Sequence, residues 1–136
     1  MSISSANTIA GHDGSAVRVT GPSGLHFLSG INPNPVYHGQ PMSASEAALP
    51  SSIRDQTELM LANLTQVLGA AGLGWTSVAK IILYLTDIRE AAAVRSAIVE
   101  RFGSDWLPAY TTVQVDNLVT RGARVQLDVI AAGPTG

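Results

Sequence analysis

The part of the sequence that most limits the possible folds runs from Val78 to Leu85 and reads VAKIILYL. A nearly continuous apolar run rich in β-branched residues is typical of a strand that is covered on both faces. Helices of the same chain can cover one of these faces. The other face needs a further layer, and a second copy of the same protein is the simplest one.

Helical patterns flank this predicted strand on both sides. Apolar residues recur at helical spacing from Ser52 to a stop at Gly72, and Ser52 with Asp55 predicts an N-cap. After the strand, Asp87 begins a D-x-x-E capping signal for a second helix that ends at Gly103. The residues predicted to face inward are Ile53, Met60, Leu64, Val67, Leu68 and Ala71 in the first helix and Ile88, Ala91, Val94, Ile98 and Phe102 in the second.

The remaining strands are predicted from alternation and turn residues. Apolar residues alternate on both sides of Gly21–Gly24, which predicts a β-hairpin. Two further strands are predicted at about 111–115 and 124–131. Residues 1–15 are small and polar and are expected to be flexible, whereas 31–51 is rich in proline and is expected to form a long loop.

These elements predict one α+β domain over residues 1–136, with the order β-β-α-β-α-β-β. Two helices can cover only one face of its single sheet, and a parallel strand pair joined by a helix should have a right-handed crossover. Only 13% of the residues are charged, which is low for a small monomer and again favours self-association.

Charge and composition also exclude several classes of partner. The net charge is −2 and the eight basic residues are scattered, so neither a nucleic-acid stripe nor a membrane patch is predicted. No segment is long and apolar enough to span a membrane. The chain has no cysteine, and its start lacks the basic and apolar regions of a signal peptide, so we expect a cytoplasmic protein.

General catalytic motifs are absent, including a P-loop, G-x-S-x-G and H-E-x-x-H. No acidic residue stands at metal-ligand spacing from His12, His26 or His38, so no metal site is expected. His26 alternates with apolar residues and is interpreted as facing solvent or an interface. Ser29 and Gly30 end a predicted strand, where the missing side chain leaves room for a ligand or a backbone, although a tight turn explains them equally well.

Several local strings together resemble the RidA/YjgF family of reactive-intermediate deaminases, also labelled L-PSP endoribonucleases. The resemblance extends from about Val17 to Ala132. It is carried by Phe27-Leu28-Ser29-Gly30, Gln56-Thr57, Asn63-Leu64, Ala70-Ala71-Gly72-Leu73, Val78 to Asp87-Ile88, Pro108-Ala109 and Val125 to Ala131.

The resemblance implies a chorismate-mutase-like fold assembled as a homotrimer, with small-molecule pockets in clefts between subunits. It also implies hydrolysis of enamines and imines such as 2-aminoacrylate without a cofactor. In the family an arginine follows the Pro-Ala pair and binds the substrate carboxylate, and a glutamate on the last strand positions or activates water. The matching residues here are Tyr110 and Gln126.

These two differences change the chemistry expected of the pocket. A phenol is one neutral donor, whereas a guanidinium carries a permanent charge and a bidentate fork. Loss of the charged pair with a carboxylate should cost about 1.5 to 3 kcal/mol. Gln126 can orient water but cannot act as a general base. Asp128 should share its strand face, but the family also has an acid at this position.

Other positions also suggest a remodelled pocket around the segment Leu107 to Thr112. Arg95 stands where the family usually has asparagine, and it is either an anion ligand or a solvated surface residue. Ile31 and Ala16 stand where the family has glutamine and an early tyrosine. Tyr110 is either a pocket residue or packed in an interface. The other candidate ligand contacts are Tyr37, His38, Thr112 and Trp106, of which Trp106 reads as an apolar lid or interface anchor; Trp75 is interpreted as a core residue.

Three functions remain open at this stage. The first is an enzyme acting on a small imine, enamine or related carbonyl compound by hydrolysis, tautomerisation or cyclisation, with Tyr110 as donor and Gln126 as orienting group. It differs from a standard 2-aminoacrylate deaminase. The second is a trimer that binds a small molecule without catalysis. The third and least favoured is an endoribonuclease, because an acidic chain with few aromatic residues offers RNA little to bind.

Overall fold

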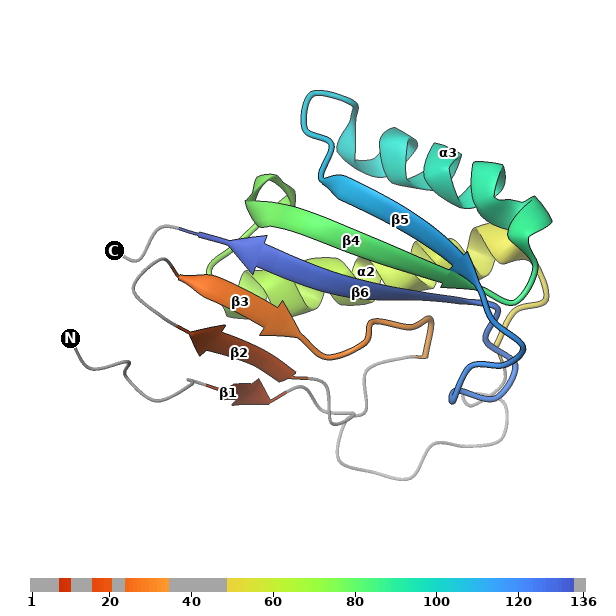
Figure 1. Ribbon diagram of the computed structural model, residues 1–136, viewed down its shortest axis with the longest axis horizontal. Helices are drawn as coiled ribbons and strands as arrows, with labels where there is room; N and C mark the ends of the chain where they lie inside the picture. The colour runs from red at the N-terminus through yellow and green to blue at the C-terminus, as the bar shows by residue number, and fades with distance from the viewer. Residues whose placement is uncertain (1–7, 11–15, 21–23, 35–48, 134–136) are drawn as a thin grey trace.

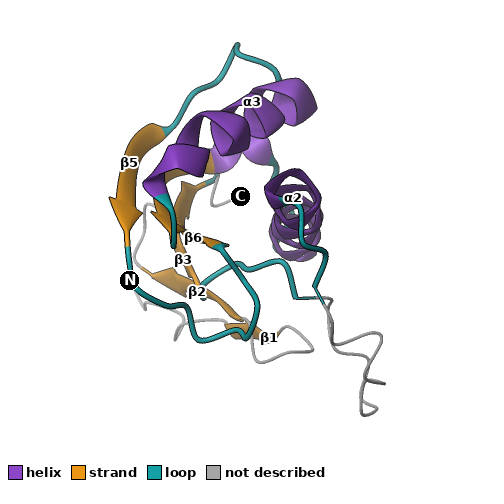
Figure 2. Cartoon of the chain, turned by 90° about the vertical axis from the view of Figure 1, so that its right-hand side faces the viewer, coloured by secondary structure: helices purple, strands orange, loops and turns teal. Residues whose placement is uncertain are grey.

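The computed structural model describes residues 8–10, 16–20, 24–34 and 49–133. Its strands are β1 (Thr8–Ala10), β2 (Ala16–Thr20), β3 (Leu25–Leu28), β4 (Val78–Leu85), β5 (Ala109–Gln114) and β6 (Val125–Ala132). They form one six-stranded sheet in the order β1-β2-β3-β6-β4-β5 (Figure 1). The helices α2 (Ile53–Ala70) and α3 (Ala91–Phe102) cover the same face of this sheet (Figure 2). The predicted α+β architecture, with both helices on one face, is therefore confirmed.

The order of elements along the chain agrees with the predicted one and adds one strand. β4 is parallel to β5, which follows it through α3, and all other neighbouring pairs are antiparallel. β1 lies within residues 1–15 and was not predicted from the sequence. In the predicted loop 31–51, Ile31 forms an isolated bridge to Leu127 of β6. Residues 35–48 of this loop lie outside the described part of the chain.

α2 begins and ends where the sequence predicts. The Ser52 hydroxyl accepts a hydrogen bond from the Asp55 backbone nitrogen at 3.2 Å, and Gly72 has a φ of 73°, which favours glycine. Met60, Leu64 and Leu68 are buried as predicted. The predicted inward residues Ile53, Val67 and Ala71 are partly buried against the same core.

A buried amide in α2 was missed by the apolar pattern. The Gln56 side chain donates to the backbone oxygens of Pro50 and Gly122, each at 2.9 Å, and accepts from the Arg124 nitrogen at 2.8 Å. It is 2% exposed, and these three bonds satisfy its polar atoms. Gln56 therefore holds the entry to α2 against the segment that leads into β6.

The second helix is preceded by a 3₁₀ turn, η2 (Ile88–Glu90), before α3 begins. The Asp87 carboxylate accepts from the Arg89 backbone nitrogen at 3.0 Å, so the predicted capping signal starts this turn. Val94 and Ile98 are buried as predicted. The prediction that Ile88 faces inward is wrong, because it is 45% exposed. A 3₁₀ turn has fewer residues per turn than an α-helix, so the helical phase cannot be extended back to this residue.

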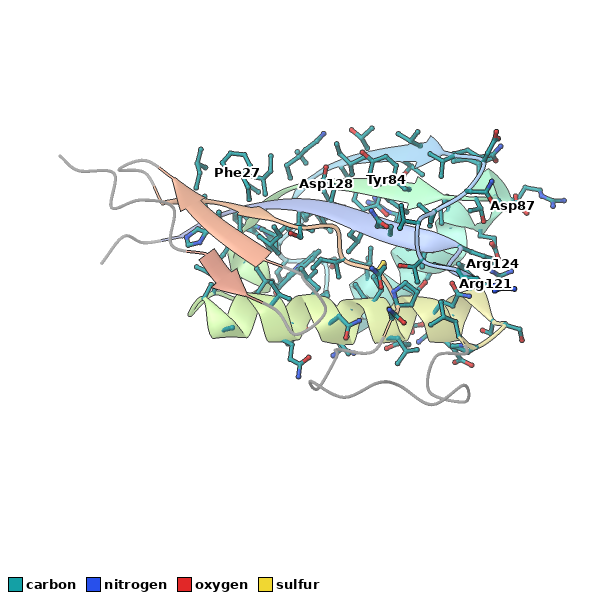
Figure 3. All side chains as sticks on the ribbon, turned by 90° about the horizontal axis from the view of Figure 1, so that it is seen from below. Phe27, Tyr84, Asp87, Arg121, Arg124 and Asp128 are labelled. Atoms are coloured by element: carbon teal, nitrogen blue, oxygen red, sulfur yellow. The ribbon has the colours of Figure 1, made fainter. Side chains whose placement is uncertain are left out.

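β4 separates the two faces of the sheet. Ile81, Leu83 and Leu85 are fully buried against the helices, while Ile82 and Tyr84 alternate with them and are only half-buried. We call the face that lies away from α2 and α3 the open face; its residues include Phe27, Ile82, Tyr84, Val113, Gln126, Asp128 and Ile130. Figure 3 shows Phe27, Tyr84 and Asp128 on the side of the sheet opposite α2. Among the described residues, α2 and α3 therefore cover one face of β4, and a layer on its other face stays a prediction.

His26 lies on the other face of β3 from the one that the sequence predicts. Its side chain is 8% exposed and shares the helix-covered face of β3 with the core residue Leu28, whereas Phe27 is 42% exposed on the open face. Burial lowers the pKa of His26. The expectation that His26 faces solvent is wrong, because the open face is itself partly apolar and takes Phe27 instead.

Candidate functional site

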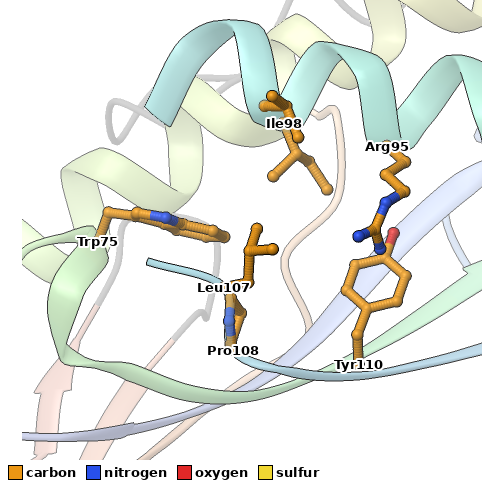
Figure 4. Close-up of a pocket in the computed structure, with 7 residues that line it drawn as sticks. Trp75, Arg95, Ile98, Leu107, Pro108 and Tyr110 are labelled. Carbon is orange, nitrogen blue, oxygen red and sulfur yellow. The ribbon is translucent and has the colours of Figure 1, made fainter. Parts of the chain in front are cut away.

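A small pocket lies between α3, β5 and the segment that joins them. Arg95, Trp75, Leu107, Pro108 and Tyr110 surround it together with Ile98 and Val99, and its volume is about 150 Å³ (Figure 4). Most of its walls are apolar, and its polar groups are the Arg95 guanidinium and the Tyr110 hydroxyl. It contains part of the segment 107–112 that the sequence singled out, and it adds Trp75, which was predicted only as a core residue.

The sheet register points Tyr110 into this pocket. Tyr110 pairs with Ile81 in the parallel β4–β5 ladder, and Ile81 is buried beneath the helices, so the phenol ring extends toward α3. Thr112 pairs with the equally buried Leu83 and shares this strand face with Tyr110, as predicted. The alternation of side chains along β5, an edge strand of the sheet, therefore places Tyr110 and Thr112 on the face that α3 covers.

The Tyr110 hydroxyl is buried and has no hydrogen-bond partner within 3.5 Å in the part of the chain that the structure describes. Burial raises the pKa of Tyr110, while the positive charge of Arg95 and the nearby Thr112 side chain act in the opposite direction. The phenol is therefore neutral at physiological pH. A buried donor without a partner is costly, and an acceptor that reached this hydroxyl would remove that cost.

Arg95 lies beside this hydroxyl. Its guanidinium carbon is 5.5 Å from the centre of the Tyr110 ring, a cation–π distance, and Figure 4 shows the guanidinium near the hydroxyl end of the ring. The ion pairs formed by described arginines belong to Arg54, Arg89, Arg101 and Arg124. No carboxylate in the described ranges is paired with Arg95. The pocket thus holds a permanent positive charge with free donors.

Two indole groups fix the segment that enters β5. The Trp75 nitrogen donates to the Trp106 backbone oxygen at 3.1 Å, and the Trp106 nitrogen donates to the Val78 oxygen at 2.8 Å. The Trp75 ring stacks on Phe102, with ring centres 4.3 Å apart. Trp106 is 42% exposed and is not part of the pocket wall, so its predicted contact with a ligand stays a prediction. The two hydrogen bonds hold Leu107 and Pro108 in place.

The other predicted catalytic residue, Gln126, belongs to a hollow on the open face. This hollow is lined by Gly30, Tyr84, Gln126 and Asp128 together with Val115, Asn117, Leu118 and Val119. A Cβ atom at Gly30 would lie 2.6 Å from Nε2 of Gln126. The space left by the missing side chain at Gly30 is thus taken by the Gln126 amide. Ser29 precedes this glycine at the end of β3.

Tyr110 and Gln126 therefore lie on opposite faces of the sheet. Gln126 pairs with Tyr84 of β4, and Tyr110 pairs with Ile81, an odd number of residues away along the same strand. Asp128 shares the open face with Gln126, as predicted. One chain consequently does not bring the two predicted catalytic residues to one substrate. Predicting this from the sequence would have required the register of β5 and β6 against β4 in addition to the alternation of side chains along each strand.

Tyr37 and His38 lie outside the described residues. Within residues 24–34 and 49–133, no group of His, Asp or Glu side chains gathers at a spacing suited to a metal ion. Neither α2 nor α3, the helices the structure describes, could cross a membrane by length and hydropathy.

Comparison with known proteins agrees with the fold. A family model described as Endoribonuclease L-PSP matches residues 17–133. "Protein mmf2, mitochondrial" of Schizosaccharomyces pombe is 35% identical over 86 residues, which cover 62% of this chain and 68% of that protein. The 2-iminobutanoate/2-iminopropanoate deaminase of Capra hircus is 34% identical over 92 residues, which cover 67% of this chain and 66% of the relative.

A solved structure supports the same assignment. The crystal structure of YyfA, a protein of the conserved Rid family from Yersinia pestis, matches with a TM-score of 0.70 and 26% identity over 85% of each chain. The alignments with the first curated relatives span 56% to 68% of those proteins' own lengths. The sequence resemblance is confirmed, and the chain belongs to the RidA/YjgF family.

Proposed function

We propose that the chain is a divergent RidA-family enzyme that acts on a small imine, enamine or related carbonyl compound. The reaction is a hydrolysis, tautomerisation or cyclisation and differs from standard 2-aminoacrylate deamination. Relatives named 2-iminobutanoate/2-iminopropanoate deaminase support the substrate class. The observation that carries the proposal is the buried Tyr110 hydroxyl, which has no partner among the described residues and faces a small, mostly apolar pocket.

Tyr110 acts in this proposal as a hydrogen-bond donor. In imine hydrolysis, water adds to the carbon of the C=N bond, and the adduct then releases ammonia to leave a carbonyl compound. A neutral phenol can hold the oxygen or nitrogen that gains electron density during these steps. Because burial raises its pKa, Tyr110 is a poor proton donor for full transfer but a suitable hydrogen-bond donor.

We further propose that the active site is shared between subunits of a homotrimer. Gln126 and Gly30 of one subunit would complete the Tyr110 pocket of its neighbour, with Ser29 and Thr112 at the same boundary. The exposed apolar side chains on the open face support such an interface, because Phe27 is 42% and Val113 is 37% exposed. Tyr37, His38 and Trp106 stay proposed ligand contacts of this site.

The test measures release of ammonia from small imines and enamines generated in place, including 2-aminoacrylate. Wild-type protein should be much slower on 2-aminoacrylate than a family member with the pocket arginine. Tyr110→Phe and Gln126→Ala should each lower turnover of the preferred substrate by about tenfold or more, the usual effect of removing one positioned donor. Wild-type turnover by Tyr110→Phe would contradict the role of Tyr110.

Mixing the two inactive variants tests whether the site is shared. In randomly reassembled trimers, about one quarter of the shared sites combine a wild-type Tyr110 with a wild-type Gln126, so about that fraction of activity should return. Activity that stays at the sum of the separate variants would contradict the shared site. The non-catalytic alternative predicts stabilisation by a small ligand with no turnover of any imine.

A cytoplasmic location stays a proposal as well. Two relatives from Schizosaccharomyces pombe are named as mitochondrial proteins. Fluorescence microscopy of the tagged protein in its native cell would decide between these locations.

A further inference from the structure

The Tyr110 pocket contains a charge that the family pattern does not supply. Arg95 comes from α3, whereas the arginine implied by the family would stand on β5 at the position of Tyr110. Arg95 lines both the Tyr110 pocket and an adjoining groove with Ala92, Ser96, Val99 and Glu100. The Glu100 carboxylate is paired with Arg54 on α2, so it does not neutralise Arg95.

We propose that Arg95 is the anion-binding residue of this pocket and that the Tyr110 ring is the platform that holds its guanidinium in place. The inference rests on the proposed function, since it assumes that the Tyr110 pocket receives the substrate. It assigns the recognition of charge to α3 and leaves the uncharged donor to β5. The ligand it predicts is a small organic anion with a short apolar part.

The geometry explains why the ring is needed. A long arginine side chain on an exposed helix position has many rotamers, and ordering it costs conformational entropy. The Tyr110 ring, with its centre 5.5 Å from the guanidinium carbon, favours rotamers directed into the pocket. The planar guanidinium keeps its N–H groups free at its edge, where they fit both oxygens of a carboxylate.

The groups around the pocket define the remainder of the ligand. The Tyr110 hydroxyl lacks a partner among the described residues and can donate to a third acceptor, such as a carbonyl oxygen or an imine nitrogen next to the carboxylate. Leu107, Pro108 and Trp75 form an apolar wall opposite Arg95. A volume of about 150 Å³ admits only a short apolar group.

The experiment compares butanoate with butanamide, which share their size and apolar chain but differ in charge. Binding to the full chain is followed by NMR titration of backbone amide signals. Wild-type protein should bind butanoate more tightly than butanamide. Arg95→Gln should weaken butanoate binding by about ten- to a hundredfold, the loss expected for a charge-assisted pair, and should weaken butanamide binding far less, because glutamine still offers an N–H donor to the neutral amide.

A matched control is available on the same helix. Arg101 lies 5.8 Å from the Phe102 ring and also carries one positive charge, but it pairs with Glu58 and does not line the pocket. Arg101→Gln should leave butanoate affinity within about twofold of wild type, because only long-range attraction is lost. Tyr110→Leu should weaken butanoate binding more than Tyr110→Phe, because the phenylalanine keeps the ring beneath the guanidinium.

The outcomes separate this inference from the proposed function. Unchanged butanoate affinity in Arg95→Gln, equal affinity of wild type for both probes, or no binding of either probe would each overturn the role of Arg95. The proposed function would still stand if Tyr110→Phe lowered turnover of an imine. Equal losses of butanoate affinity in Arg95→Gln and Arg101→Gln would show a general charge effect and would also overturn the role of Arg95.

Discussion

The two hollows on either side of the sheet differ in what a single chain has completed. The Tyr110 pocket is closed by α3 and by Leu107 and Pro108, which the two indole hydrogen bonds hold in place. It contains the Arg95 guanidinium and a phenol hydroxyl that has no hydrogen-bond partner among the described residues. The hollow at Gln126 is more open, and its amide lies over Gly30 on the face of the sheet that neither α2 nor α3 covers. The two residues that match the family's catalytic positions, Tyr110 and Gln126, thus lie on opposite faces of the sheet, because side chains alternate along a strand. In our proposal the closed side recognises a ligand and the open side meets another subunit.

The largest expected effect compares the two faces at adjacent positions of β4. Leu83→Ala removes a fully buried side chain beneath the helices and should lower the free energy of unfolding by about 2 to 5 kcal/mol. Ile82→Ala, on the open face, should weaken self-association instead, so its melting temperature should depend on protein concentration more strongly than that of wild type. Urea unfolding and sedimentation at several concentrations measure both. Equal, concentration-independent losses would mean that no subunit covers the open face.

An intermediate effect concerns the glycine beneath Gln126. Gly30→Ala should displace the flexible Gln126 amide, because the new Cβ would lie 2.6 Å from its nitrogen, and should lower imine turnover by about tenfold with little loss of stability. The control is Gly69→Ala in α2, where no atom lies within 4 Å of the added Cβ. That change should stabilise the protein by about 0.4 to 1 kcal/mol and leave turnover intact. Full activity in Gly30→Ala would remove the Gln126 hollow from the active site.

The smallest effect is a pH dependence that only the helix-covered face should show. Burial lowers the pKa of His26 from its usual 6.5, so the unfolded chain binds a proton more readily than the folded one. The stability contributed by neutral His26 is complete above about pH 6.5 and is lost as the pH falls from there toward the lower folded pKa. Urea unfolding between neutral and mildly acidic pH measures this loss. His26→Gln should reduce the slope, and an unchanged slope would assign it to other groups.

The sequence alone determined the features that depend on neighbouring residues. The Ser52 cap, the stop at Gly72 and the strand from Val78 to Leu85 appear in the structure where they were predicted. Each depends on local hydrogen bonds or on the periodicity of side chains along one element, and both can be recognised in the amino-acid sequence. The family strings likewise predicted the fold, because they preserve the same local pattern throughout the domain.

The tertiary structure determined which face of the sheet each side chain occupies and which side chains it contacts, and therefore which residues form the candidate site. Which side of the sheet Tyr110 and Gln126 occupy depends on the register of β5 and β6 against β4, which no local pattern contains. The contact between Arg95 and Tyr110 depends on how α3 crosses that sheet. His26 and Ile88 were misplaced for the same reason, since burial is set by what packs against a residue. The sequence singled out Tyr110 as a candidate site residue, and the packing of α3 over β5 placed the charged Arg95 beside it.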